Sequence, residues 1–283
     1  MKNVLVTGGK GQLASCIRDA IKDLKDFNFL FVDSDKLDIT KENEVKDFFS
    51  TYQIEYCVNC AAYTAVDKAE AEPQMAKDVN EEGAKNLAKF CKDHRAILIQ
   101  VSTDFVFDGQ QSVPYKEEDV TNPLGIYGMT KLNGEKEAIM TKEHFVIRTS
   151  WLYSEHNHNF LKTMLKIGKE REELSVVYDQ IGTPTYAGDL ATAILKIITS
   201  KSSCYGVYHF SNEGVASWYD FAKAIFEEAN NKIKVNPIKS EEYPTPAKRP
   251  HYSVLDKSKI KHKMDIEIPH WRDSLRRCLL KLK

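Results

Sequence analysis

The first half of the chain alternates between short apolar runs and longer segments whose apolar residues recur every three or four positions. In the third longer segment, Ala84, Leu87, Ala88 and Cys91 form one apolar helical stripe. The short runs are NVLVTG (3–8), FNFLFVD (27–33), IEYCVNCA (54–61), AILIQVS (96–102) and HFVIRTSW (144–151). Because these runs lack polar alternation, they favour strands buried on both faces, as in a parallel sheet covered by helices. The pattern predicts an α/β fold with a Rossmann-type, doubly wound parallel sheet.

After residue 151 the pattern changes to fewer apolar runs and more irregular connections. Residues 159–172 and 217–230 have helical spacing, 175–186 and 206–212 are typical of short strands, and 240–254 form a proline-rich loop. We therefore expect two domains. The larger domain comprises residues 1–151 plus about 174–201, and a smaller α/β domain comprises about 152–173 and 202–283.

Composition narrows the class of protein. Of the 283 residues, 42% are hydrophobic and 29% are charged, which is ordinary for a globular chain, and the formal net charge of -1 argues against general nucleic-acid binding. The apolar runs are too short to span a bilayer, and no secretory segment precedes the first strand. We expect a soluble, cytoplasmic protein with no nucleic-acid or membrane partner.

Two of the six cysteines, Cys57 and Cys60, form a C-x-x-C pair. Such a pair can act in redox chemistry or supply half of a zinc site, but no second C-x-x-C or H-x-x-H lies nearby. The apolar run around the pair favours a strand with a structural role, and we predict no metal site.

A glycine loop follows the first predicted strand. Gly8, Gly11 and Ala14 form a G-x-x-G-x-x-A pattern before the first predicted helix. Gly8 permits a tight turn, Gly11 lets a pyrophosphate approach the backbone, and Ala14 allows close helix–strand packing. Asp33 ends the second predicted strand, where an acidic residue accepts the ribose hydroxyls of NAD(H) and repels a 2′-phosphate. Lys10 and Lys36 lie close enough in sequence to soften that repulsion.

Tyr127 and Lys131 lie four positions apart in IYGMTKLNGEK (126–136), directly after the helix-breaking TNPLG. A Tyr-x-x-x-Lys match also occurs by chance on solvated helix faces, but here it opens a helix in a chain with a dinucleotide loop. We expect Tyr127 to protonate a carbonyl oxygen as hydride arrives from NAD(P)H. Free tyrosine has a pKa of about 10, and the Lys131 ammonium together with an oxidised nicotinamide is expected to lower it. Lys131 is also expected to hold the cofactor ribose.

Polar residues end the fourth predicted strand. Ser102, Thr103 and Asp104 follow the apolar run at 96–101. Ligands of open α/β sheets bind at the carboxyl ends of the strands. These residues can simply begin a loop, but their location favours a site that polarises the carbonyl.

These motifs resemble the extended short-chain dehydrogenase/reductases. More closely, LDIT, NCAAYTAVDKAE, STDFVFDG, YGMTKLNGE, RTSWLY, NFLKTML and DQIGTPT together resemble the dTDP-4-dehydrorhamnose reductase family, from the first strand to about PTPAKRP. The resemblance implies reduction of dTDP-4-dehydro-L-rhamnose to dTDP-L-rhamnose with NADH or NADPH, in the last step of dTDP-L-rhamnose biosynthesis. Another nucleotide-sugar 4-ketoreductase or epimerase, or a non-catalytic nucleotide-binding regulatory subunit, remains open at this point.

The resemblance also implies roles for individual residues. It implies the catalytic set Thr103, Tyr127 and Lys131, cofactor contacts at Gly11, Gln12, Leu13, Asp33, Asp38, Ile39, Ala62, Tyr63 and Thr64, and sugar-nucleotide contacts at Thr103, Asp104 and Trp151. A tryptophan at a strand end can pack on a sugar face, although Trp151 can equally fill a domain interface. Arg249 can reach a diphosphate or form a surface salt bridge.

A magnesium-bridged dimer occurs in some members of this family. The carboxylate expected just after the glycine motif is absent here, because residues 14–17 read Ala-Ser-Cys-Ile. A thiol does not suit magnesium, so we expect no magnesium dependence and leave the oligomeric state as monomer or homodimer.

Overall fold

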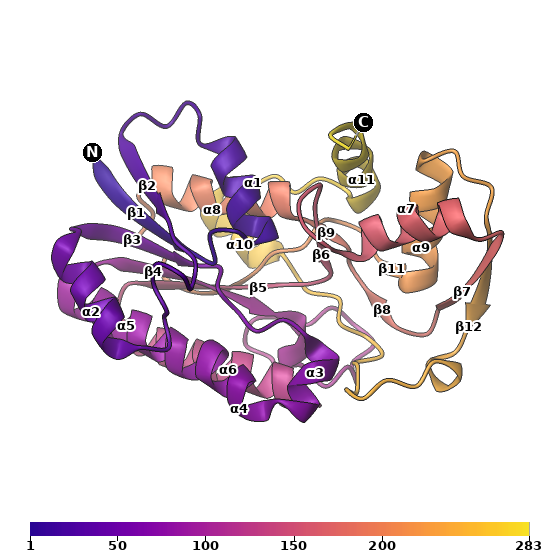
Figure 1. Ribbon diagram of the computed structural model, residues 1–283, viewed down its shortest axis with the longest axis horizontal. Coiled ribbons are helices and arrows are strands. Elements are labelled where there is room, and N and C mark those ends of the chain that lie inside the picture. Colours follow the sequence, from indigo (N-terminus) through magenta and orange to yellow (C-terminus); the bar gives the residue numbers. More distant parts are fainter. Residues whose placement is uncertain (283) are drawn as a thin grey trace.

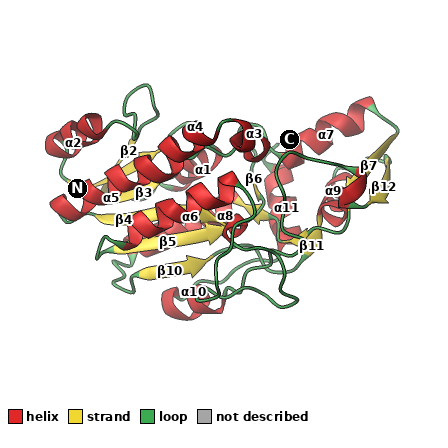
Figure 2. Cartoon of the chain, turned by 90° about the horizontal axis from the view of Figure 1, so that it is seen from below, coloured by secondary structure: helices red, strands yellow, loops and turns green. Residues whose placement is uncertain are grey.

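The chain is built around a six-stranded parallel sheet. The structure is a computed structural model that describes residues 1–282. The sheet has the order β10-β5-β4-β3-β1-β2, and all its pairings are parallel (Figures 1 and 2). Its strands are β1 (Lys2–Thr7), β2 (Phe27–Phe31), β3 (Ile54–Asn59), β4 (Ile97–Thr103), β5 (His144–Thr149) and β10 (Gly206–His209). The predicted α/β fold with a doubly wound parallel sheet is confirmed.

Apolar side chains extend from both faces of the sheet. Val4 and Val6 of β1 join one buried cluster, and Leu5 between them joins the cluster on the opposite face. Helices α1 (Gln12–Ala20), α8 (Ala187–Thr199) and α10 (Ser258–Met264) cover the first face, and α2 (Glu42–Thr51), α5 (Gly83–His94) and α6 (Ile126–Ile139) cover the second (Figure 1). Burial on both faces explains why the strand sequences show no polar alternation.

Short elements connect β3 to β4 and lead into the site. They are α3 (Val66–Ala71), α4 (Pro73–Lys77) and a π-helical turn (Asp78–Glu82), and a 3₁₀ turn (Asp104–Val106) follows β4. Cys57 is buried within β3 and Cys60 follows the strand, as the structural interpretation of the C-x-x-C pair expects.

The smaller part of the chain packs around its own apolar cluster. It contains α7 (Phe160–Glu170), α9 (Trp218–Glu228) and α11 (Trp271–Leu280), with β7 (Glu173–Val177) paired in parallel to β12 (Lys234–Ile238). Its other elements are the two-residue strands β6 (Leu152–Tyr153), β8 (Ile181–Gly182), β9 (Thr185–Tyr186) and β11 (Ala216–Ser217), and a 3₁₀ turn (Ser240–Glu242). This part lies beyond the carboxyl end of the sheet (Figure 1).

Several elements lie on the other side of the domain boundaries expected from the sequence, and β7 and β10 show this most clearly. β7 begins at the expected return to the larger domain, but it pairs with β12 outside the main sheet. β10 follows residue 202, but it forms the sixth strand of the main sheet beside β5. Strand patterns identify both elements, whereas their partners depend on long-range pairing that the local sequence does not specify. The division into two domains stays a prediction.

Among residues 1–282, no helix combines the length and the apolar character that crossing a membrane requires.

Candidate active site

A cavity of about 910 Å³ opens at the carboxyl ends of β1, β3 and β4. The glycine loop, the segment after β3, the end of β4 and the start of α6 form its larger wall, and residues 149–152 and 157–160 together with Trp218 and Arg249 form the other. Every residue predicted for the site lines this cavity except Tyr63. The Tyr63 hydroxyl donates to Glu72 and its backbone N–H to Asn80. A cofactor contact of Tyr63 stays a prediction.

The glycine loop brings backbone groups to the cavity. Gly8 has φ +60, and a Cβ there would lie 2.8 Å from the backbone nitrogen of Ala61, so only glycine fits this turn. Gly11 precedes the first turn of α1 and has no side chain to cap it. Because Gly11, Gln12 and Leu13 line the cavity, the positive N-terminal end of α1 faces a space that suits a phosphate anion.

Asp33 lies at the expected end of β2 and lines the cavity. Its Oδ1 accepts a hydrogen bond from the Ser34 backbone at 3.0 Å, and Lys10 Nζ is 4.0 Å from its Oδ2. Lys10 is closer to Asp35, at 3.0 Å. Lys36 is exposed and does not line the cavity. The carboxylate thus has one cationic neighbour, Lys10, of the two that the sequence suggested.

Tyr127 is brought to the end of β4 by a close helix approach. A Cβ on Gly128 would lie 2.2 Å from the carbonyl oxygen of Phe105, so glycine allows α6 to pack against this backbone. The Phe105 and Tyr127 rings then meet edge to face with centroids 5.6 Å apart. Burial raises the pKa of Tyr127 to about 12, which the neighbouring Thr103 hydroxyl partly offsets and the Asp104 carboxylate reinforces. Here desolvation outweighs the Thr103 hydrogen bond, and the lowering expected from Lys131 together with an oxidised nicotinamide stays a prediction.

Lys131 lies one turn further along α6 and is buried. Its Nζ donates to the carbonyl oxygen of Val101 at 2.7 Å. Burial lowers the pKa of Lys131 to about 8, while the Glu135 carboxylate raises it. At neutral pH most of the lysine is therefore still protonated.

Behind Lys131, Glu135 belongs to a buried polar network. Arg148 donates to both of its carboxylate oxygens, with Nε 3.0 Å from Oε1 and a guanidinium nitrogen 2.8 Å from Oε2. The Ser102 hydroxyl also donates to Glu135. We refer to Ser102, Glu135 and Arg148 as the Glu135 network. It places a fully bonded negative charge one helical turn beyond Lys131.

Thr103 and Asp104 end β4 inside the cavity. The Thr103 hydroxyl donates to Asp104 Oδ1 at 3.1 Å and accepts from the Phe105 backbone at 3.2 Å. Burial raises the pKa of Asp104 to about 6, with the Ser253 and Thr103 hydroxyls acting in the opposite direction. Two hydroxyls, those of Thr103 and Tyr127, therefore lie together beside an acid whose charge is disfavoured.

Trp151 stacks on Trp218, with ring centroids 3.6 Å apart and ring planes at 7°. Trp218 is the first residue of α9, and the capping box of Ser217 and Asp220 fixes the start of that helix. Both indoles line the cavity. Sequence reasoning identified the α9 helix but missed Trp218 as a site residue. It also missed the cavity-lining residues 157–160, although the NFLKTML motif includes two of them.

Arg249 forms the ion pair that the sequence left as an alternative. Its guanidinium donates to both carboxylate oxygens of Asp67, at 3.0 and 2.7 Å. Arg249 also lines the cavity, so its contact with a diphosphate stays a prediction.

The residues near position 16 do not suit magnesium. Cys16 Sγ lies within 4.8 Å of a Glu155 carboxylate oxygen and a His156 ring nitrogen. Burial and the Glu155 charge raise the pKa of the Cys16 thiol to about 12, whereas magnesium requires hard oxygen ligands. Lys281 donates to Glu155 at 2.9 Å and neutralises that carboxylate. The absence of a magnesium requirement stays a prediction, which this set of donors supports.

The chain is similar to known proteins along its whole length. The profile of the RmlD substrate binding domain family matches residues 1–283. The dTDP-4-dehydrorhamnose reductase of Aggregatibacter actinomycetemcomitans is 41% identical over 287 residues, covering 98% of each chain. A crystal structure of a dTDP-4-dehydrorhamnose reductase from Clostridium acetobutylicum has a TM-score of 0.96 at 41% identity and covers 99% of both chains. That from Bacillus anthracis, in complex with NADP, also has a TM-score of 0.96, at 39% identity, covering 99% of this chain and 100% of that one.

The family profile spans the chain, and the matching relatives share its length, its fold and about two fifths of its residues. This chain belongs to the RmlD family of dTDP-4-dehydrorhamnose reductases.

Proposed function

We propose that this protein reduces the 4-keto group of dTDP-4-dehydro-L-rhamnose to give dTDP-L-rhamnose, with NADH or NADPH as the hydride donor. The observation that carries the proposal is the meeting of Thr103, Tyr127 and Lys131 with the glycine loop in one cavity. The names of the relatives supply the sugar nucleotide, and the NADP complex of the Bacillus anthracis relative agrees with a dinucleotide cofactor.

The residues of the cavity fit such a cofactor. Gly8 and Gly11 place no side chain at the turn, and the N-terminus of α1 offers backbone donors to a diphosphate. Asp33 suits the ribose hydroxyls at the other end of the same wall. When bound, the nicotinamide supplies the hydride that reaches the sugar carbon.

Tyr127 supplies the proton in this mechanism. Reduction requires a protonated acid, and the raised pKa of Tyr127 keeps its hydroxyl protonated throughout the neutral range. The proton moves from the Tyr127 oxygen to the former carbonyl oxygen as that oxygen gains charge. The Thr103 hydroxyl turns from Asp104 to donate to the same oxygen. The Lys131 ammonium stabilises the resulting tyrosinate until solvent returns a proton.

A product assay tests the proposed function. The protein is offered a panel of nucleotide 4-keto sugars with NADH and with NADPH, and the configuration of each product at C4 is determined by NMR. We expect dTDP-4-dehydro-L-rhamnose to be reduced fastest, and the two cofactors to differ by less than about a hundredfold, or 2.7 kcal/mol, because Lys10 offsets Asp33. Faster reduction of another sugar would overturn the assignment of the substrate. If NADPH supports reduction and NADH does not, Asp33 does not bind the ribose.

The proposal includes a cytoplasmic location and either a monomer or a homodimer, as expected from the sequence.

A further inference from the structure

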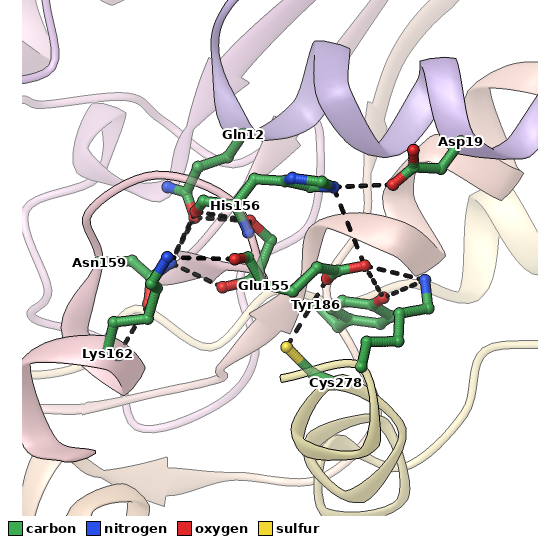
Figure 3. A network of polar contacts seen from close by, with 10 residues as sticks. Gln12, Asp19, Glu155, His156, Asn159, Lys162, Tyr186 and Cys278 are labelled. Atoms are coloured by element: carbon green, nitrogen blue, oxygen red, sulfur yellow. Dashed lines mark hydrogen bonds and ion pairs between the residues drawn. The ribbon is translucent and has the colours of Figure 1, made fainter. Parts of the chain in front are cut away.

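The loop between β6 and α7 reaches across to the glycine loop. This 154–159 segment (Ser154–Asn159) contacts the N-terminal region at separate points (Figure 3). Asn157 Nδ2 donates to the Lys10 carbonyl oxygen at 2.6 Å. Gln12 Oε1 accepts from Ser154 Oγ at 3.0 Å and from Asn159 Nδ2 at 2.9 Å. Residues that precede the smaller part's first helix therefore hold the side chain of the first residue of α1.

The orientation of the Asn159 amide is fixed by backbone groups. Its Oδ1 accepts from the backbone N–H of Lys162 at 3.1 Å, as the N-cap of α7. Its Nδ2 donates to the carbonyl oxygens of Ser154 at 2.8 Å and His156 at 3.2 Å. A flipped amide would set N–H against N–H and oxygen against two oxygens, so this assignment follows from the hydrogen bonds. The Asn159 atom that faces Gln12 is consequently a donor.

That donor determines the orientation of Gln12. Because Asn159 Nδ2 donates toward Gln12, the group that receives it must be the carbonyl oxygen of the Gln12 amide. The Ser154 hydroxyl shares its single proton between this oxygen, at 3.0 Å, and the His156 carbonyl oxygen, at 3.1 Å. The Gln12 NH₂ group is thereby turned away from the 154–159 segment, and it donates to no group among residues 1–282. Gln12 lines the cavity beside Gly11, at the start of α1. A side-chain donor is thus added to the helix N-terminus where anionic oxygens bind most favourably.

We propose that Asn159 and Ser154 are positioning residues that hold the Gln12 amide with its NH₂ group toward the diphosphate of the dinucleotide cofactor. The inference rests on the proposed function, since it assumes a dinucleotide in this cavity. The inference goes beyond the proposed function because it assigns part of the cofactor affinity to residues that act through Gln12. Without the donors of Asn159 and Ser154, the Gln12 side chain can rotate or flip its amide. Binding of the cofactor must then order this side chain.

A double-mutant cycle on NADPH binding tests this inference. The variants are Gln12→Met, similar in length but without the amide, Asn159→Ser, which keeps an N-cap hydroxyl but is too short to reach Gln12, and the double variant. Dissociation constants are measured by NADPH fluorescence without sugar nucleotide. We expect Gln12→Met to weaken binding about tenfold or more, as for a lost hydrogen bond to a charged group. We expect Asn159→Ser to weaken it about two- to tenfold, the cost of ordering one free side chain.

The coupling between the two positions decides the outcome. In the Gln12→Met background, Asn159→Ser should change NADPH affinity by less than twofold, because its effect passes through the missing amide. A merely structural role of Asn159 at the α7 cap would give the same loss in both backgrounds and would overturn the inference. If Asn159→Ser unfolds, Ser154→Ala replaces it in the same cycle with the same criterion. Failure of the unmodified protein to bind NADPH or NADH at all would instead contradict the proposed function.

Discussion

The two walls of the cavity are stabilised by different kinds of contact. On the sheet side, buried polar side chains are linked across strands. Thr7 donates to Asn59 at 2.6 Å, and Asn59 donates to Gln100 at 2.8 Å. In the smaller part, aromatic rings pack against one another behind the cavity wall. Phe160 packs against both Trp218 and Phe221.

The difference follows from how each wall holds its backbone. Five parallel pairings fix the strands of the main sheet, so a buried polar group there finds its partner at a defined position. Among the described residues, the smaller part has one five-residue pairing and two two-residue pairings between its strands. Rings tolerate small displacements better than buried hydrogen bonds do. The groups that we propose to move protons therefore lie on the sheet wall, and the stacked indoles lie on the other.

The sharpest test of this contrast is Tyr127→Phe. The ring and its packing remain while the proton donor is lost, so turnover should fall by about two to four orders of magnitude, with folding and cofactor affinity retained. Product formation from dTDP-4-dehydro-L-rhamnose and NADPH binding are measured separately. Thr103→Val, which is similar in shape, should slow turnover less. Near-normal turnover of a Tyr127→Phe protein that binds cofactor normally would eliminate Tyr127 as the acid.

Arg148→Met should cause the largest loss of stability. It leaves the Glu135 carboxylate, 1% exposed, without its main partner, and breaking a buried ion pair in this way costs about 3–5 kcal/mol. The free energy of unfolding is measured by urea denaturation. Arg148→Met combined with Glu135→Leu should recover part of the loss, because no buried charge is left unpaired. Equal losses in the single and double variants would show that the pair matters only for its volume.

Asp104 should make the sheet wall sensitive to pH. Its folded-state pKa of about 6 lies above the usual value of 3.8, so its contribution to stability is present below pH 3.8 and is lost as pH rises through 6. Relative to Asp104→Asn, which does not titrate, the unfolding free energy of the unmodified protein should fall by about 2–3 kcal/mol between pH 4 and pH 7.5. Denaturation of both proteins at the two pH values checks this. A constant difference would mean that Asp104 is not desolvated.

On the aromatic wall, Trp218→Leu should affect binding rather than chemistry. Loss of the stack frees the Trp151 ring, and ordering one free side chain on binding costs about 0.5–1.5 kcal/mol, which corresponds to a rise of two- to about tenfold in the KM for the sugar nucleotide. Steady-state kinetics with saturating NADPH measures it. A fall in kcat comparable to that of Tyr127→Phe would abolish the distinction between the walls.

The smallest effect is expected from metal removal. Because the donors around Cys16 do not suit magnesium, a chelator should change neither activity nor the sedimentation coefficient. Dissociation of a dimer on adding chelator would contradict this expectation.

The sequence predicted the sheet side of the molecule well, because its signals are local. Gly8 and Gly11 mark a turn by their own conformational freedom, and Tyr127 and Lys131 share a helix face through their spacing alone. The order of strands in the sheet could be predicted from the sequence only in part, because β10 pairs with β5, which lies far away in the chain.

The other wall depends on contacts between distant segments. Trp218 belongs to the site because it stacks on Trp151, and Asn159 becomes significant only where it meets Gln12. The raised pKa of Tyr127 likewise reflects burial by surrounding elements, which the Tyr-x-x-x-Lys spacing does not report. Sequence patterns identify such residues as helix caps or core positions, and the fold gives them their further roles.

The contact between Lys281 and Glu155 has a consequence for the order of events during synthesis. The glycine loop and α1 leave the ribosome early, and the 154–159 segment follows much later. Helix α11, whose C-cap is Lys281, emerges later still, and only then does Glu155 gain its ammonium partner at 2.9 Å. Because domains fold as they emerge, the sheet can form well before the 154–159 segment has both of its contacts, one with the glycine loop and one with Lys281. A nascent chain should therefore acquire its full affinity for the dinucleotide only after α11 has been made.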